Sequence, residues 1–133
     1  MTLSFMMALV APMMIIAPAA YAEDAVKPDF SEVKSLAAAE ALAAQGKLVK
    51  ILLFPAEFGG EDIPQNVVYV THAAADAREI MLGTLMRLVR EGVVNKLDVK
   101  PEYRGTSFVP IRILITARHR TGPGSFVPVI EVW

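Results

Sequence analysis

Three carboxylates gather on one short segment of the chain. Glu57, Glu61 and Asp62 flank the pair Gly59 and Gly60, in a stretch whose glycines and prolines indicate a loop. Clustered carboxylates can bind a divalent cation or supply an acid and a base for hydrolysis. The spacing differs from that of the Asp-x-Asp-x-Asp-Gly calcium loop, and solvated loop charges are the alternative interpretation.

Other residues with catalytic chemistry are sparse. The chain has no cysteine, which excludes thiol catalysis, and its only histidines are His72 and His119. Because a zinc site needs three or four ligands, we predict no metal. Ser107 and Ser125 lie outside any Gly-x-Ser-x-Gly elbow and are typical of turns. We therefore assign no catalytic residue and no cofactor, and the sequence favours a non-enzymatic role.

Aromatic and charged side chains suited to protein recognition occur near the acidic loop and further along the chain. Tyrosine and arginine are enriched at interface hot spots. Arg112 interrupts an apolar strand, where its guanidinium can bind a carboxylate or phosphate. The alternative for Arg112 is an ion pair with Glu102 or Asp98 across a hairpin. The candidate partner-binding residues are Phe58, Glu61, Asp62, Tyr103, Arg104 and Arg112.

Two helices and two strands are predicted in the first part of the folded chain. Strong helix formers predict an Ala-rich helix over 31–45, beginning near Ser31. Short β-branched and apolar runs predict strands over 47–54 and 66–71. The segment 73–93 predicts an amphipathic helix, since it has a wide apolar face. Its polar stripe comprises Asp76, Glu79, Gly83, Arg87 and Arg90.

Three further strands are predicted over 96–103, 109–118 and 126–133, joined by short turns. Short connections force neighbouring strands into an antiparallel meander. We therefore predict a single α+β domain over 31–133, with a two-layer architecture. It has a mainly antiparallel sheet of about five strands, covered by the amphipathic helix, plus the N-terminal Ala-rich helix. We expect Leu85 and Ile113 to be buried, facing each other between helix and sheet.

The N-terminal segment predicts export. Residues 1–22 carry no charge and end in Ala20-Tyr21-Ala22, the small-residue pattern of a signal-peptide cleavage site. We predict cleavage after Ala22, a linker over 23–30, and a periplasmic or secreted bacterial protein. The alternative is an uncleaved membrane anchor, because about 20 apolar residues can span a bilayer.

Overall charge limits the partners of the mature protein. The formal net charge is −1, with both signs interspersed along the chain. This distribution offers no electrostatic footprint for nucleic acid or an anionic membrane surface. We therefore expect another protein as the partner, with no membrane contact after cleavage. The sequence leaves the oligomeric state open.

Three segments carry a resemblance: residues 53–70, residues 101–110 except Thr106, and the closing 129–133. They resemble small uncharacterised bacterial exported α+β proteins, some of which are thought to act as immunity or accessory proteins beside toxins. The resemblance implies no reaction and no catalytic residues. Our leading hypothesis is a non-enzymatic protein-binding domain of the cell envelope, with an immunity-type inhibitor as one such role. The alternative is a small exported hydrolase or ligand-binding domain that uses Glu57, Glu61 and Asp62.

Overall fold

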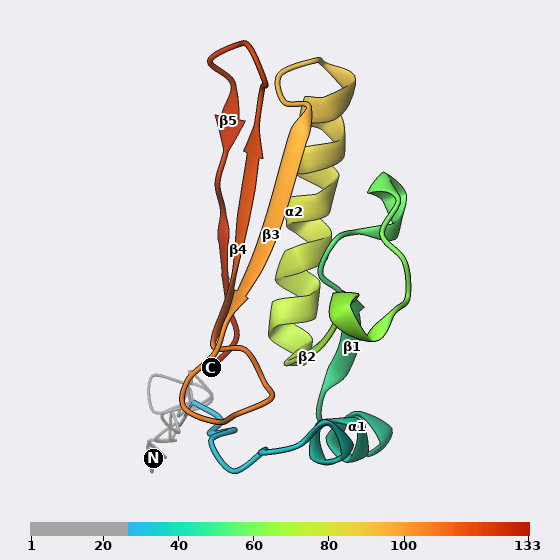
Figure 1. Ribbon diagram of the computed structural model, residues 1–133, viewed down its shortest axis with the longest axis vertical. Helices are drawn as coiled ribbons and strands as arrows, with labels where there is room; N and C mark the ends of the chain where they lie inside the picture. The colour runs from blue at the N-terminus through green and yellow to red at the C-terminus, as the bar shows by residue number, and fades with distance from the viewer. Residues whose placement is uncertain (1–26) are drawn as a thin grey trace, which may run out of the picture.

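A computed structural model describes residues 27–133, and the predicted signal peptide with its Ala20 and Ala22 cleavage pattern lies outside this range. Within residues 27–133, two helices, two short 3-10 turns and six strands follow one another (Figure 1). They are α1 (Leu36–Ala44), β1 (Val49–Leu52), η1 (Ala56–Phe58), η2 (Pro64–Asn66), β2 (Val67–Val70), α2 (His72–Arg90), β3 (Lys96–Glu102), β4 (Arg112–Arg118), β5 (Ser125–Phe126) and β6 (Val129–Glu131). The helices and antiparallel strands confirm the predicted α+β class.

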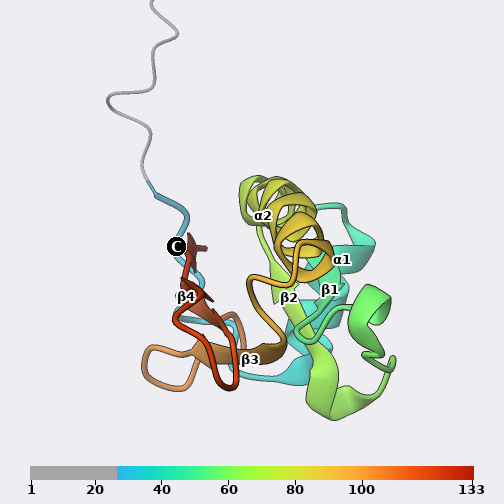
Figure 2. The same cartoon turned by 90° about the horizontal axis from the view of Figure 1, so that it is seen from above.

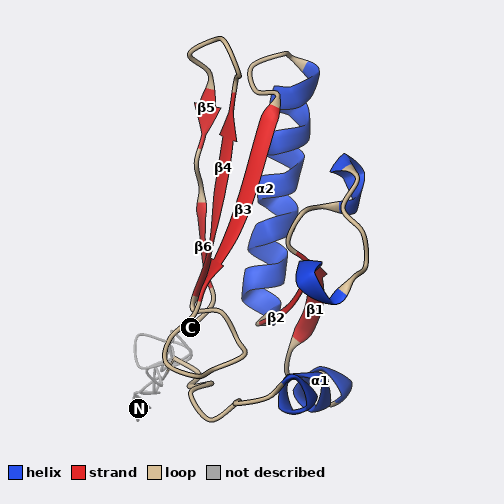
Figure 3. Ribbon diagram, in the orientation of Figure 1, coloured by secondary structure: helices blue, strands red, loops and turns tan. Residues whose placement is uncertain are grey.

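The strands form two antiparallel sheets (Figure 3). β1 pairs with β2, while β4 lies between β3 on one side and both β5 and β6 on the other. The final strand expected over 126–133 is divided, although β5 and β6 keep one register along β4. Pro128 lies in the gap, and proline has no N–H to donate to a ladder.

The first helix begins later than the sequence predicts. Ser35 is its N-cap and accepts a hydrogen bond from the Ala38 N–H at 3.1 Å. Ser31 instead donates its N–H to the Asp29 carboxylate at 2.9 Å and lies in a turn. The local Asx hydrogen bond competes with helical pairing, which explains why the helix does not extend back to Ser31.

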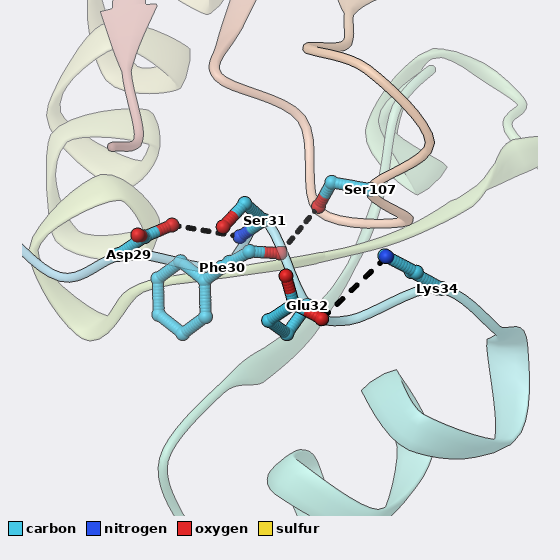
Figure 4. Close-up of polar contacts among 6 residues, drawn as sticks. All are labelled: Asp29, Phe30, Ser31, Glu32, Lys34 and Ser107. Atoms are coloured by element: carbon cyan, nitrogen blue, oxygen red, sulfur yellow. Dashed lines mark hydrogen bonds and ion pairs between the residues drawn. The ribbon is translucent and has the colours of Figure 1, made fainter.

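Backbone contacts far apart in sequence hold this turn against the rest of the domain (Figure 4). The Ser107 hydroxyl donates to the Phe30 carbonyl at 2.8 Å and accepts from the Val109 N–H at 3.1 Å. The Phe108 N–H donates to the Val33 carbonyl at 2.7 Å. Ser107 is buried, so its hydrogen bonds satisfy a polar group that would be costly to bury alone.

The second helix runs along one face of the larger sheet (Figures 1 and 2). Thr71 caps its start by accepting from the Ala74 N–H at 3.2 Å, and Gly92 follows its end with φ of 72°. All members of the expected polar stripe are exposed, which confirms that side of the helix. Arg87 in this stripe also pairs with Glu91, four residues further along, at 3.1 Å.

The buried side chains form two clusters, and this separates two residues that we expected to face each other. Leu85 is 3 % exposed and packs with Val94 and Ala117 in the smaller cluster. Ile113 is 2 % exposed and belongs to the larger cluster, which joins both sheets and both helices. Since a strand rises about 3.3 Å per residue, Ile113 lies roughly 13 Å along β4 from Ala117. Both residues are buried as predicted, but the expected contact between them is wrong.

Candidate functional site

The acidic loop is held in a defined shape by one asparagine. The Asn66 side chain accepts from the Phe54 N–H at 2.7 Å and donates to the carbonyls of Phe54 and Glu61, each at 3.0 Å. Gly60 passes so close to Phe54 that a Cβ at Gly60 would overlap with the Phe54 carbonyl oxygen. The loop backbone therefore packs tightly against the end of β1, and glycine is required there.

The three carboxylates of this loop do not converge. Asp62 pairs with the Lys50 ammonium at 2.9 Å, and this hydrogen bond raises the pKa of Lys50. Glu57 faces a different depression, beside β1 and α2. Within residues 27–133, no three acidic or histidine side chains are grouped to hold a metal ion. The loop thus lacks the convergent carboxylates on which the cation and hydrolase interpretations depend.

The two segments expected to share a partner surface lie on different sides of the molecule. Phe58 and Glu61 belong to the loop after β1, whereas Tyr103 and Arg104 follow the end of β3, near the C-terminus (Figures 1 and 2). The Arg104 guanidinium lies 5.2 Å from the ring centroid of Trp133. Tyr103 is half-exposed, and partial burial raises the pKa of its hydroxyl.

Arg112 forms the cross-strand ion pair that the sequence offered as one of two alternatives. Its guanidinium lies 3.9 Å from the Glu102 carboxylate on β3 and 3.5 Å from the Glu131 carboxylate on β6. All three side chains are partly exposed, so the row of charges has a modest effect on stability. These two contacts match the ion-pair alternative for Arg112.

The two histidines serve separate local contacts. His72 is the first residue of α2, and its ring lies 2.6 Å from the Gly46 carbonyl oxygen, just after α1. His119 Nδ1 accepts from the backbone N–H groups of Gly122 at 2.7 Å and Thr121 at 3.1 Å. These contacts hold the turns that flank α2 and β4.

One edge of β1 carries backbone groups that point away from β2. The Leu53 N–H donates to the Asn66 carbonyl at 2.8 Å, and the register pairs Ile51 with Val68. Because hydrogen-bonded pairs alternate along an antiparallel ladder, the odd-numbered residues of β1 bond to β2. The N–H and C=O groups of Lys50 and of Leu52 therefore face the free edge.

A groove of about 400 Å³ follows this edge, between β1 and the first half of α2. Arg78 lies across it: its side chain is 13 % exposed and donates to the Leu52 carbonyl at 2.8 Å. Arg78 is not among the partner-binding residues expected from the sequence. Its helical spacing from Leu82 and Leu85 places it on the apolar face, and that spacing is the signal that could have identified it.

The polar side chains around the groove are mainly acidic. Glu57, Asp76 and Glu79 line it, and of these only Glu79 has an ion-pair partner among residues 27–133, Arg78 at 3.5 Å. Lys50 also lines the groove, but its ammonium is bound to Asp62. The groove thus combines an open strand edge with three carboxylates, and two of them, Glu57 and Asp76, have no ion-pair partner among residues 27–133.

Comparisons with family models, with curated proteins and with solved structures found no match to this chain. Neither described helix has the combination of length and apolar character needed to cross a membrane.

Proposed function

We propose that this chain is an exported, non-enzymatic protein-binding domain that adds an extended segment of its partner to the free edge of β1. One observation carries the proposal: the outward N–H and C=O groups of Lys50 and the N–H of Leu52 border the groove beside α2. Exposed strand edges with a neighbouring helix are suited to β-strand addition, in which main-chain hydrogen bonds provide affinity.

The charges of the groove favour a basic partner segment. A strand places alternate side chains on opposite faces, so every second residue of a bound segment can approach α2. Lysine or arginine at these positions would meet Asp76 and Glu79 on the helix, and Glu57 at the groove's end. Complementary charge of this kind contributes to specificity and to the association rate.

This proposal moves the contact surface away from the residues expected from sequence. None of the six expected residues lines the groove. Phe58 and Asp62 line other hollows, Tyr103 and Arg104 follow β3, and Arg112 is paired within the larger sheet. An immunity-type inhibitor of another protein is compatible with strand addition. The hydrolase alternative draws less support from the acidic loop, because Glu57 and Asp62 line different hollows.

Export remains part of the proposal and has a separate test. We propose that residues 1–22 are removed after Ala22 and that the mature protein works in the periplasm or outside the cell. N-terminal sequencing of the exported product should begin at Glu23. Retention of residues 1–22 in a membrane fraction would show an anchor instead.

Strand addition is tested with two synthetic strands and two variants at one position. The probes are capped heptapeptides that alternate valine with lysine, or valine with glutamate. Lys50→Pro removes an outward N–H and leaves the ladder with β2 intact, because proline is tolerated on a free edge. Lys50→Ala is the matched control, since it removes the same ion pair with Asp62 but keeps the N–H.

We expect calorimetry to detect binding of the lysine peptide and much weaker binding of the glutamate peptide. Lys50→Pro should weaken the lysine peptide at least about fivefold relative to Lys50→Ala, which corresponds to one lost backbone hydrogen bond. Equal affinity of the two variants would place the peptide elsewhere. Equal affinity for both peptides would show that the carboxylates do not select the partner, and no binding of either would contradict strand addition.

A further inference from the structure

A second cavity opens beside the last turns of α2, away from the β1 groove. Its volume is about 420 Å³, within the range of small-molecule sites. Three parts of the chain form its apolar walls: the loop after β1, the second helix and the larger sheet. The main wall residues are Phe54, Phe58, Leu85, Val89, Leu97 and Ala117.

The cavity lies where the inward row of β4 ends in a small side chain. The inward row of β4 continues from the bulky Ile113 and Ile115 to Ala117, which is fully buried. Leu85 and Val94 are also almost fully buried, so the base of the cavity is fixed by packing. Phe58 and Leu97 pack against this cluster but remain only partly buried. An apolar ligand in the cavity would cover their remaining exposed surface.

The polar part of the wall carries positive charge alone. Lys96 and Arg120 both line the cavity, and among residues 27–133 no aspartate or glutamate does. Within residues 27–133, neither cation has an ion-pair partner. Asn95 fixes the backbone at this point, since its side-chain oxygen accepts from the Arg120 N–H at 2.8 Å. The cavity thus presents an apolar interior beside two uncompensated cations.

We infer that this cavity binds a small organic anion with an apolar body, such as an aromatic or branched aliphatic carboxylate. The body would lie against the side chains of Leu85, Leu97 and Ala117, where burial of apolar surface is favourable. The acidic group would remain near Lys96 and Arg120. This site is independent of the β1 groove, because the two share no lining residue.

Two fluorescent probes that share the same N-phenylnaphthylamine skeleton test the inference. The first, 1-anilinonaphthalene-8-sulfonate, carries a single sulfonate, and the second, N-phenyl-1-naphthylamine, is its uncharged counterpart. We expect the folded protein to bind one molecule of either probe, the sulfonate more tightly. Raising the salt concentration should weaken the sulfonate alone, because salt screens exposed charges.

The charges are tested by the double variant Lys96→Gln with Arg120→Gln. Sulfonate binding should weaken by roughly three- to tenfold, as expected for loss of two exposed cations, while the neutral probe is unaffected. Lys47→Gln with Lys100→Gln is the control, because it changes the net charge equally at residues outside the cavity wall. Unchanged sulfonate affinity in the first double variant would overturn the assignment of Lys96 and Arg120.

The cavity itself is tested by filling it. Val89→Trp places a large ring at the cavity wall from a half-exposed position, and we expect both probes to lose binding. Ile80→Trp, at a position of α2 that is 76 % exposed, is the matched control. Undiminished binding to a Val89→Trp protein with a wild-type melting temperature would place the probes elsewhere. If Val89→Trp fails to fold, the charge variants decide the question alone. Lys50→Pro changes only the β1 groove, so it should bind both probes as the wild type does.

Discussion

Truncating Leu85 and Ile113 to alanine should have unequal effects, although both side chains are almost fully buried. Each substitution removes three carbon groups, which corresponds to about 2.4 kcal/mol of lost transfer free energy at about 0.8 per group. Their surroundings differ, because Leu85 lines the 420 Å³ cavity and Ile113 lies within the larger cluster. A side chain beside a void has fewer packing partners to lose.

We therefore expect Leu85→Ala to lower the free energy of unfolding by about 2–3 kcal/mol, close to the transfer contribution alone. Ile113→Ala should lower it by about 4 kcal/mol, because a closed cavity adds a further cost. The difference of about 1–2 kcal/mol exceeds the usual error of urea denaturation when the m-values agree.

Urea melts of the two variants, with Ile80→Ala as the exposed control, measure these differences. The control should change the free energy of unfolding by less than about 0.5 kcal/mol. A loss in Leu85→Ala as large as in Ile113→Ala would refute the reasoning. It would mean that Leu85 is as closely packed as the main core and that the neighbouring cavity is closed in solution.

Three further predictions follow from contacts of single residues. Gly60→Ala should destabilise by roughly 2–4 kcal/mol through backbone overlap, whereas Gly83→Ala, with open space at its Cβ, should stabilise by about 0.5–1 kcal/mol in urea melts. Hydrogen bonds from the Ser31 side chain and N–H lower the pKa of Asp29. They therefore stabilise the fold at pH values above 3.8, the ordinary pKa of this carboxyl, and this stabilisation is lost as the pH falls through the lowered pKa. Ser31→Ala removes the hydroxyl but keeps the N–H, so an NMR titration should show the Asp29 pKa moving part of the way back up. No change would exclude the Ser31 hydroxyl as a cause. Arg112→Ala should cost less than about 1 kcal/mol despite its two glutamate neighbours, and a larger loss would indicate a stronger charge network.

Much of the local structure was determined by the sequence itself. The polar stripe of α2 and the strand alternation in β3 both follow from neighbours in the chain. The connection from β3 to β4 does not, because it spans residues 103–111 where a short turn was predicted. The pair between Arg112 and Glu102 was one of two alternatives offered by the sequence, and the register of β3 with β4 places these two residues opposite each other. By contrast, closeness in sequence was misleading for the acidic loop, where Glu57 and Asp62 face different depressions.

The candidate sites were decided only by the tertiary structure. Arg78 bonds to the Leu52 carbonyl, 26 residues earlier in the sequence. Lys96 and Arg120 line one cavity because β3 pairs with β4. Periodicity reports which side of a helix or strand is buried, but not which other element covers it. The division into two sheets, the free edge of β1 and the hollow beside Ala117 therefore depend on how those buried faces pack together.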